Sequence, residues 1–130
     1  MNLPFPLKLY AILAFLSALS ALWRGMDFLM HHVAMSRIAL ELLWAAFQTV
    51  LGVGILCLKP AARIVALICC WFTFVLFILV LVFWCIRPQN ISVVAFLAVM
   101  VATALNTYFY IIFRRPDIRA MFEFDSSRPF

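Results

Sequence analysis

Residues 64–86 read IVALICCWFTFVLFILVLVFWCI, a stretch without a single charged side chain. An α-helix rises about 1.5 Å per residue, so about 20 apolar residues cross the roughly 30 Å hydrocarbon core of a bilayer. This stretch meets that requirement, and so do residues 7–23, 38–58 and 91–113. The sequence therefore predicts four transmembrane helices.

The composition of the whole chain agrees with this prediction. Of 130 residues, 68% are hydrophobic and 12% are charged, whereas a soluble domain has about 25% charged residues. Too few polar side chains are present to cover a water-soluble core, which argues against soluble enzymes and nucleic-acid-binding proteins. We expect an all-α membrane protein with a single integral membrane domain, residues 1–130, and a cytoplasmic tail, residues 114–130.

The connections between the predicted spans indicate how the helices follow one another. Residues 59–63 and 87–90 are short, basic and each contain a proline, which favours antiparallel neighbours in an up-down bundle. The connection at residues 24–37 is longer. Its apolar residues recur with a helical period, which predicts a short interfacial helix. These residues are Met26, Leu29, Met30 and Val33.

The first span has a second interpretation, because it is similar to a secretory signal peptide. Lys8 precedes an apolar run, and the small residues Ala18, Ser20 and Ala21 stand near a plausible cleavage point. We expect this segment to be a retained helix.

Basic residues predict the orientation in the membrane, because short cytoplasmic segments carry an excess of Lys and Arg. With the N-terminus inside, seven of the 10 basic residues are cytoplasmic and three are outside. Both termini are therefore predicted to be cytoplasmic. The seven are Lys8, Lys59, Arg63, Arg114, Arg115, Arg119 and Arg128, and the three are Arg24, Arg37 and Arg87.

Small residues predict where the helices approach one another closely. They recur along three of the spans, and we expect these faces to meet inside the bundle. The third span, with several phenylalanines and few small residues, is expected to face lipid or a partner protein. The small residues are Ala11, Ala14, Ser17, Ala18 and Ala21, then Gly52 and Gly54, and finally Ala95, Ala98 and Ala102.

Polar side chains within the spans form a candidate intramembrane site, since each is costly in lipid unless it is paired or hydrated. Glu41 and Gln48 share one face of the second helix, and Thr103 and Asn106 share one face of the fourth. Facing each other, the two stripes could line a path for a proton, ion or small solute. The alternative that we favour is interhelical hydrogen bonding, with Glu41 paired to Arg37 four residues earlier.

The outer connection contains soft metal ligands of the kind that suit Cu(I). Against a metal site, the same methionines form the apolar face of the predicted interfacial helix, and His31 stands four residues after Asp27, the spacing of a helical ion pair. We predict neither metal nor cofactor. The ligand candidates are Met26, Met30, His31, His32 and Met35.

The segment after the fourth span combines basic and apolar residues. Ile118, Met121 and Phe122 share a helical face, which predicts a short helix on the cytoplasmic leaflet. Three arginines would contact anionic lipid there, each contributing about 1 kcal/mol. They are Arg114, Arg115 and Arg119.

The span layout and this tail resemble a loose group of small, uncharacterised four-span bacterial membrane proteins. The similarity lies in a Leu- and Gly-rich second helix, the short basic connection at residues 59–63 and the tail pattern. The resemblance implies a bacterial inner membrane and no particular activity. The matching tail positions are Tyr110, Arg115, Pro116, Asp117, Ile118, Arg119 and Phe122.

From the sequence we expect a non-catalytic accessory or structural component of a membrane assembly. Its partners would be membrane lipids and either further copies of the chain or a larger membrane protein complex, with no nucleic acid. The second interpretation is an oligomeric channel or small-solute transporter lined by Gln48 and Asn106. An enzyme is not expected, because the residues offer no nucleophile with a base and no paired carboxylates.

Overall fold

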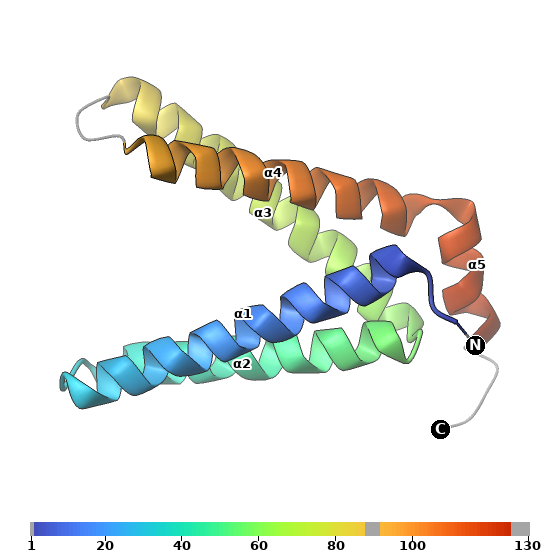
Figure 1. The fold of residues 1–130 in the computed structure, drawn as a ribbon, viewed down its shortest axis with the longest axis horizontal. Helices are drawn as coiled ribbons and strands as arrows, with labels where there is room; N and C mark the ends of the chain where they lie inside the picture. The colour runs from blue at the N-terminus through green and yellow to red at the C-terminus, as the bar shows by residue number, and fades with distance from the viewer. Residues whose placement is uncertain (1, 88–91, 126–130) are drawn as a thin grey trace. The chain divides into compact units, whose positions relative to one another are not determined.

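The computed structural model describes residues 2–87 and 92–125, and these residues form helices and no strands. The first four helices are long and apolar enough to cross a membrane. By its internal contacts the chain divides into two compact units, Met1–Ala62 and Arg63–Phe130. The helices are α1 (Phe5–Met30), α2 (Met35–Leu56), α3 (Pro60–Ile86), α4 (Val93–Arg114) and α5 (Pro116–Asp125) (Figure 1).

The four predicted spans are confirmed as helices, but α1 differs at its C-terminal end. It continues to Met30, so the segment expected to form a separate interfacial helix supplies the last turns of α1. Gly25 lies within α1 without interrupting it. The residue is buried, and a Cβ built on it would lie 3.7 Å from the Cβ of Glu41 in α2, so α1 packs closely on α2 at this point. The apolar residues beyond it thus extend a helix that is already packed.

Helices α1 and α2 end in the same way. His32 and Leu58 both have φ of 53°, the left-handed conformation that closes many helices. After each, a backbone amide turns back to the helix: Val33 donates to the Phe28 carbonyl oxygen at 2.9 Å, and Lys59 donates to that of Gly54 at 2.9 Å. These are Schellman motifs, formed without glycine.

The sequence predicts Pro60 within the connection at residues 59–63. In the structure Pro60 is instead the first residue of α3. Proline suits this position because the first amides of a helix have no partner within the helix and its fixed φ is already helical. The connection from α2 to α3 is therefore only residues 57–59. The expected turn at Pro88, Gln89 and Asn90, and Ile91 after it, lie outside the described residues.

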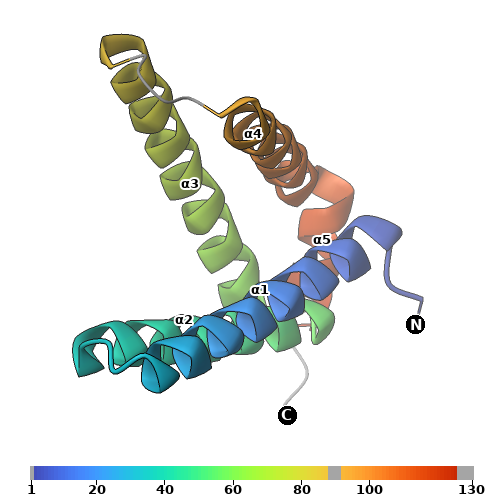
Figure 2. The same cartoon turned by 60° about the vertical axis from the view of Figure 1, so that its left-hand side comes forward.

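In the first unit, α1 packs on α2 through small residues. Figures 1 and 2 show the two helices side by side along most of their length. A Cβ on Gly52 of α2 would lie 2.9 Å from the Phe15 ring of α1, so the ring packs directly against the backbone of Gly52. The expected small-residue face of α1 is confirmed by its buried residues, which include Ala11, Ala14, Ala18, Ala21 and Gly25.

In the second unit, side-chain contacts join the start of α3 to the end of α4 and the end of α3 to the start of α4. Within this unit Ala98 is exposed and Ala95 and Ala102 are half-buried, and the expected meeting of these small residues with those of α1 and α2 stays a prediction. Polar and aromatic side chains make the contacts between α3 and α4. The contacting pairs are Arg63 with Phe113, Cys70 with Asn106, and Trp84 with Phe96.

Helix α4 ends because of the proline that follows. Arg115 has an extended backbone, with φ of −60° and ψ of 137°, as expected for a residue before proline. Pro116 then starts α5, and Asp117 places a negative charge at its positively polarised N-terminus. Figures 1 and 2 show the change of chain direction between the two helices.

Candidate functional site

The polar residues of the first unit are centred on an ion pair between α1 and α2. The Arg24 guanidinium donates through Nε to Oε1 and through Nη2 to Oε2 of Glu41, both at 3.1 Å. Its Nη1 donates to Ser20 Oγ, also at 3.1 Å. This two-point geometry is the strongest that arginine makes with a carboxylate. It joins residues on either side of the turn between α1 and α2.

The ion-pair partner predicted for Glu41 is wrong. The sequence predicts Arg37 on the same helix, but Glu41 binds Arg24 on the neighbouring helix. The connection after α1 is so short that residues equally far from it on α1 and α2 lie opposite each other. A second bond joins the two helices farther from the connection, where Trp44 Nε1 donates to Ser17 Oγ at 3.2 Å.

The two α4 residues of the predicted polar site, Thr103 and Asn106, donate to carbonyl oxygens of the protein. Asn106 Nδ2 donates to the carbonyl oxygen of Cys70 on α3 at 2.7 Å. Thr103 Oγ1 donates to the Val99 carbonyl within α4 at 2.8 Å. Only Asn106 therefore links two helices, whereas the threonine satisfies its hydroxyl within its own helix.

Asn106 also lines a pocket between α3 and α4, which we call the α3–α4 pocket. Its volume is about 200 Å³ and its lining is mainly apolar. This volume is smaller than the roughly 300–1,000 Å³ of sites that enclose drug-sized ligands. The pocket residues are Cys70, Trp71 and Phe74 of α3 and Asn106, Thr107 and Tyr110 of α4.

Two arginines lie against the last turn of α4. Arg63 Nη1 donates to the Phe113 carbonyl oxygen at 2.9 Å, where a cation also complements the negative end of the helix dipole. The guanidinium carbon of Arg114 lies 5.6 Å from the centre of the Tyr110 ring, and its Nη1 donates to the Tyr110 hydroxyl at 3.3 Å. Arg114 thus borders the α3–α4 pocket through Tyr110.

Two further basic residues in the described part of this end are paired with acids. Arg115 contacts Asp117 at 3.2 Å and Arg119 contacts Glu123 at 2.6 Å. The hydrogen bond to Glu123 and the negative charge of the Glu123 carboxylate raise the pKa of the Arg119 guanidinium. Arg114, Arg115 and Arg119 are all exposed, as contact with a lipid surface requires.

The apolar face of α5 does not have the role that we predicted. Ile118 and Phe122 are buried within the protein and are not available to lipid. The Phe122 ring meets Phe113 of α4 edge to face, with ring centres 6.4 Å apart. Because the chain changes direction at Pro116, the apolar side of α5 folds back onto the end of α4.

The soft-ligand candidates lie at the end of α1 and the start of α2. His31 is within 3.3 Å of the Asp27 carboxylate, which confirms the predicted helical pair. Met26, Met30 and Met35 are largely exposed. Within the described part of the chain, no group of three or more His, Cys, Asp or Glu residues is arranged to hold a metal ion.

The predicted intramembrane site is divided between the two units. Glu41 and half-buried Gln48 belong to the first unit, and Thr103 and Asn106 belong to the second. A continuous polar path through all four stays a prediction.

Sequence reasoning missed Arg24 as the ion-pair partner, although its position relative to the turn was a usable signal.

Sequence reasoning also missed the α3–α4 pocket and the contact of Arg114 with Tyr110. The spacing of these two residues, one helical turn apart, was the available signal.

The chain matches no protein family, no curated protein and no solved structure.

Proposed function

We propose that the chain is a non-catalytic accessory or structural component of a membrane assembly, present as a homo-oligomer or within a larger complex. The observation that carries this proposal is the bond from Asn106 to the Cys70 carbonyl. Asn106 is well placed to line a solute path, but its side chain links α4 to α3 through this hydrogen bond. Hydrogen bonds of this kind are common structural links between membrane helices.

The apolar surface of the helices supports the same role. Helix α3 is the most apolar of the four long helices, and large side chains such as Trp71, Phe72 and Phe83 are about 60% exposed. Such a surface needs lipid or another protein around it. A protein that offers mostly apolar helix faces is suited to packing within an assembly.

The proposed arrangement is an antiparallel up-down bundle in a bacterial inner membrane, with both termini in the cytoplasm. The contacts that join the end of one helix to the start of the next, in each unit, support the antiparallel order. The basic residues support the orientation, because seven lie on the predicted inner side and three on the outer side.

Native mass spectrometry of the protein extracted gently from its own membrane tests the proposal. We expect a defined stoichiometric assembly, either with another membrane protein or with further copies of the chain. A chain that remains monomeric in several mild detergents and in nanodiscs would contradict it.

The second candidate is a channel or small-solute transporter lined by Gln48 and Asn106. Reconstituted protein distinguishes the two functions. If the side chains are structural, Asn106→Leu lowers stability by about 0.6 kcal/mol, the average for such bonds, and no ion flux is seen for either protein. Flux through the unmodified protein that disappears in Gln48→Leu or Asn106→Leu at unchanged stability would favour the channel.

A further inference from the structure

We propose that the α3–α4 pocket holds part of an acyl chain of an anionic phospholipid, whose phosphate group binds Arg114. The inference goes beyond the proposed structural role. It requires α3 and α4 to span the membrane, and it does not depend on which side the termini occupy. It rests on an apolar pocket, a cation at its edge and the distribution of carboxylates around that cation.

The pocket fits a segment of hydrocarbon chain. Trp71 and Phe74 provide aromatic surface on α3, and Tyr110 provides it on α4. Its volume of about 200 Å³ is too small for a drug-sized molecule, which needs roughly 300 Å³ or more. Trp71, which lines the pocket, is 63% exposed, so a chain from the surrounding bilayer can reach it.

A cation stands where the headgroup of such a lipid would lie. Arg114 is the last residue of α4, so a spanning α4 brings it to the membrane interface. Its guanidinium is held over the Tyr110 ring, one of the pocket walls. One of its five donors is used on the Tyr110 hydroxyl, and the others remain for phosphate oxygens.

The pairing of charges singles out Arg114 among the arginines near it. Arg115 and Arg119 each have a carboxylate partner, Asp117 and Glu123. Among the described residues, Arg114 contacts no carboxylate. Arg63, which belongs to α3, binds the Phe113 carbonyl oxygen in the last turn of α4. An anion is therefore attracted most strongly to the edge of the pocket.

Tryptophan quenching by brominated lipids tests the site. A variant with Trp71 as its single tryptophan is reconstituted with phosphatidylglycerol or phosphatidylcholine brominated on the acyl chains. We expect phosphatidylglycerol to compete for the position near Trp71 about fivefold better, the advantage of one basic residue at a membrane surface. Arg114→Gln should remove this preference, whereas Arg119→Gln, which removes the same charge beside Glu123, should keep it.

A second pair of variants tests the pocket itself. Thr107→Phe replaces a small pocket-lining side chain with an aromatic ring that fills the pocket and should abolish the preference, while Thr107→Ser should retain it. If Arg114→Gln and Arg119→Gln reduce the preference equally, or if Thr107→Phe leaves it unchanged, the lipid is held by general surface charge and the site is refuted. If neither lipid quenches Trp71 or a single Trp84, α3 does not span the bilayer, and the proposal fails together with the membrane assignment.

Discussion

Gly54 shows how a single missing side chain determines the path of the backbone. It lies near the end of α2, and a Cβ built on it would lie 2.7 Å from the Cβ of Ala62 in α3. Real Cβ atoms do not approach so closely, and neither atom is the end of a flexible side chain. The close approach of the two backbones at this corner therefore depends on glycine at position 54.

We predict that Gly54→Ala destabilises the protein. Overpacking costs about 1–3 kcal/mol, which outweighs the gain of up to about 1 kcal/mol from replacing a helical glycine. Unfolding in mixed micelles measures the change.

Gly25→Ala is the matched control, because its new Cβ would meet Glu41 at the ordinary distance of 3.7 Å, and it should be neutral or stabilising. In an Ala62→Gly background, Gly54→Ala should lose its cost. Equal effects of Gly54→Ala in both backgrounds would show that the close contact is not the cause.

At the scale of elements, α5 illustrates how an amphipathic pattern can be assigned to the wrong surface. The period of Ile118, Met121 and Phe122 predicts the helix, and the helix is present. The pattern does not say what covers the apolar side. The turn at Pro116 directs Phe122 to Phe113, so protein and not lipid buries that side chain.

The order of α5 should therefore depend on Phe122 rather than on anionic lipid. Phe122→Ala removes a fully buried ring, and such losses cost about 3–5 kcal/mol. We expect much faster amide exchange over residues 117–124 in this variant, and slow exchange in the unmodified protein even in neutral detergent. Met121→Ala, at a half-buried position, should change exchange little. Slow exchange only when anionic lipid is added would restore the surface-anchor interpretation.

The ends of the elements were harder to predict than the elements themselves. Hydrophobic length alone predicted the four long helices. It could not predict that His32 and Leu58 would adopt the left-handed conformation, since neither is the usual glycine. For the site, the hydrogen-bonding role of Asn106 was among the predictions, but its partner is a backbone carbonyl, which no side-chain pattern reveals.

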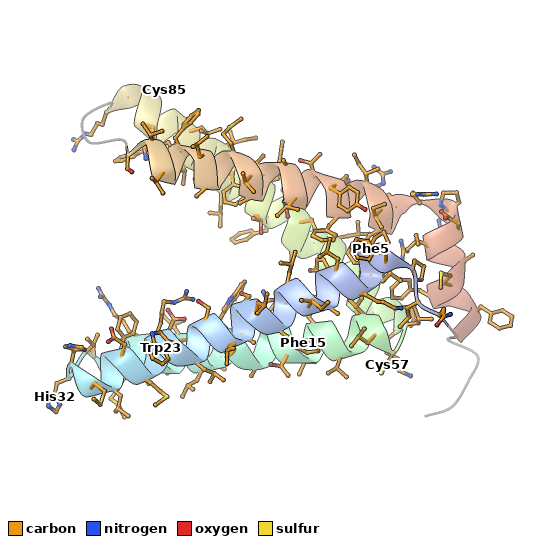
Figure 3. All side chains as sticks on the ribbon, in the orientation of Figure 1. Phe5, Phe15, Trp23, His32, Cys57 and Cys85 are labelled. Carbon is orange, nitrogen blue, oxygen red and sulfur yellow. The ribbon has the colours of Figure 1, made fainter. Side chains whose placement is uncertain are left out.

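At the scale of the whole molecule, the proposed topology can be tested at the two ends of α2. Figure 3 shows His32 at the turn after α1 and Cys57 at the opposite end of α2. Both residues are exposed. Between them α2 has 22 residues, which at about 1.5 Å each give about 33 Å, enough to cross the hydrocarbon core.

We predict that His32 faces the outside and Cys57 the cytoplasm, because Lys59 and Arg63 follow Cys57 and belong to the basic majority that favours the inner side. In a background lacking the other cysteines, a membrane-impermeant maleimide should label H32C in intact cells. The native thiol of Cys57 should react only after the membrane is permeabilised. Prior labelling of H32C should block a later permeant reagent, which controls for reactivity. The reverse pattern would invert the topology, and labelling of both positions from one side would show that α2 does not cross the membrane.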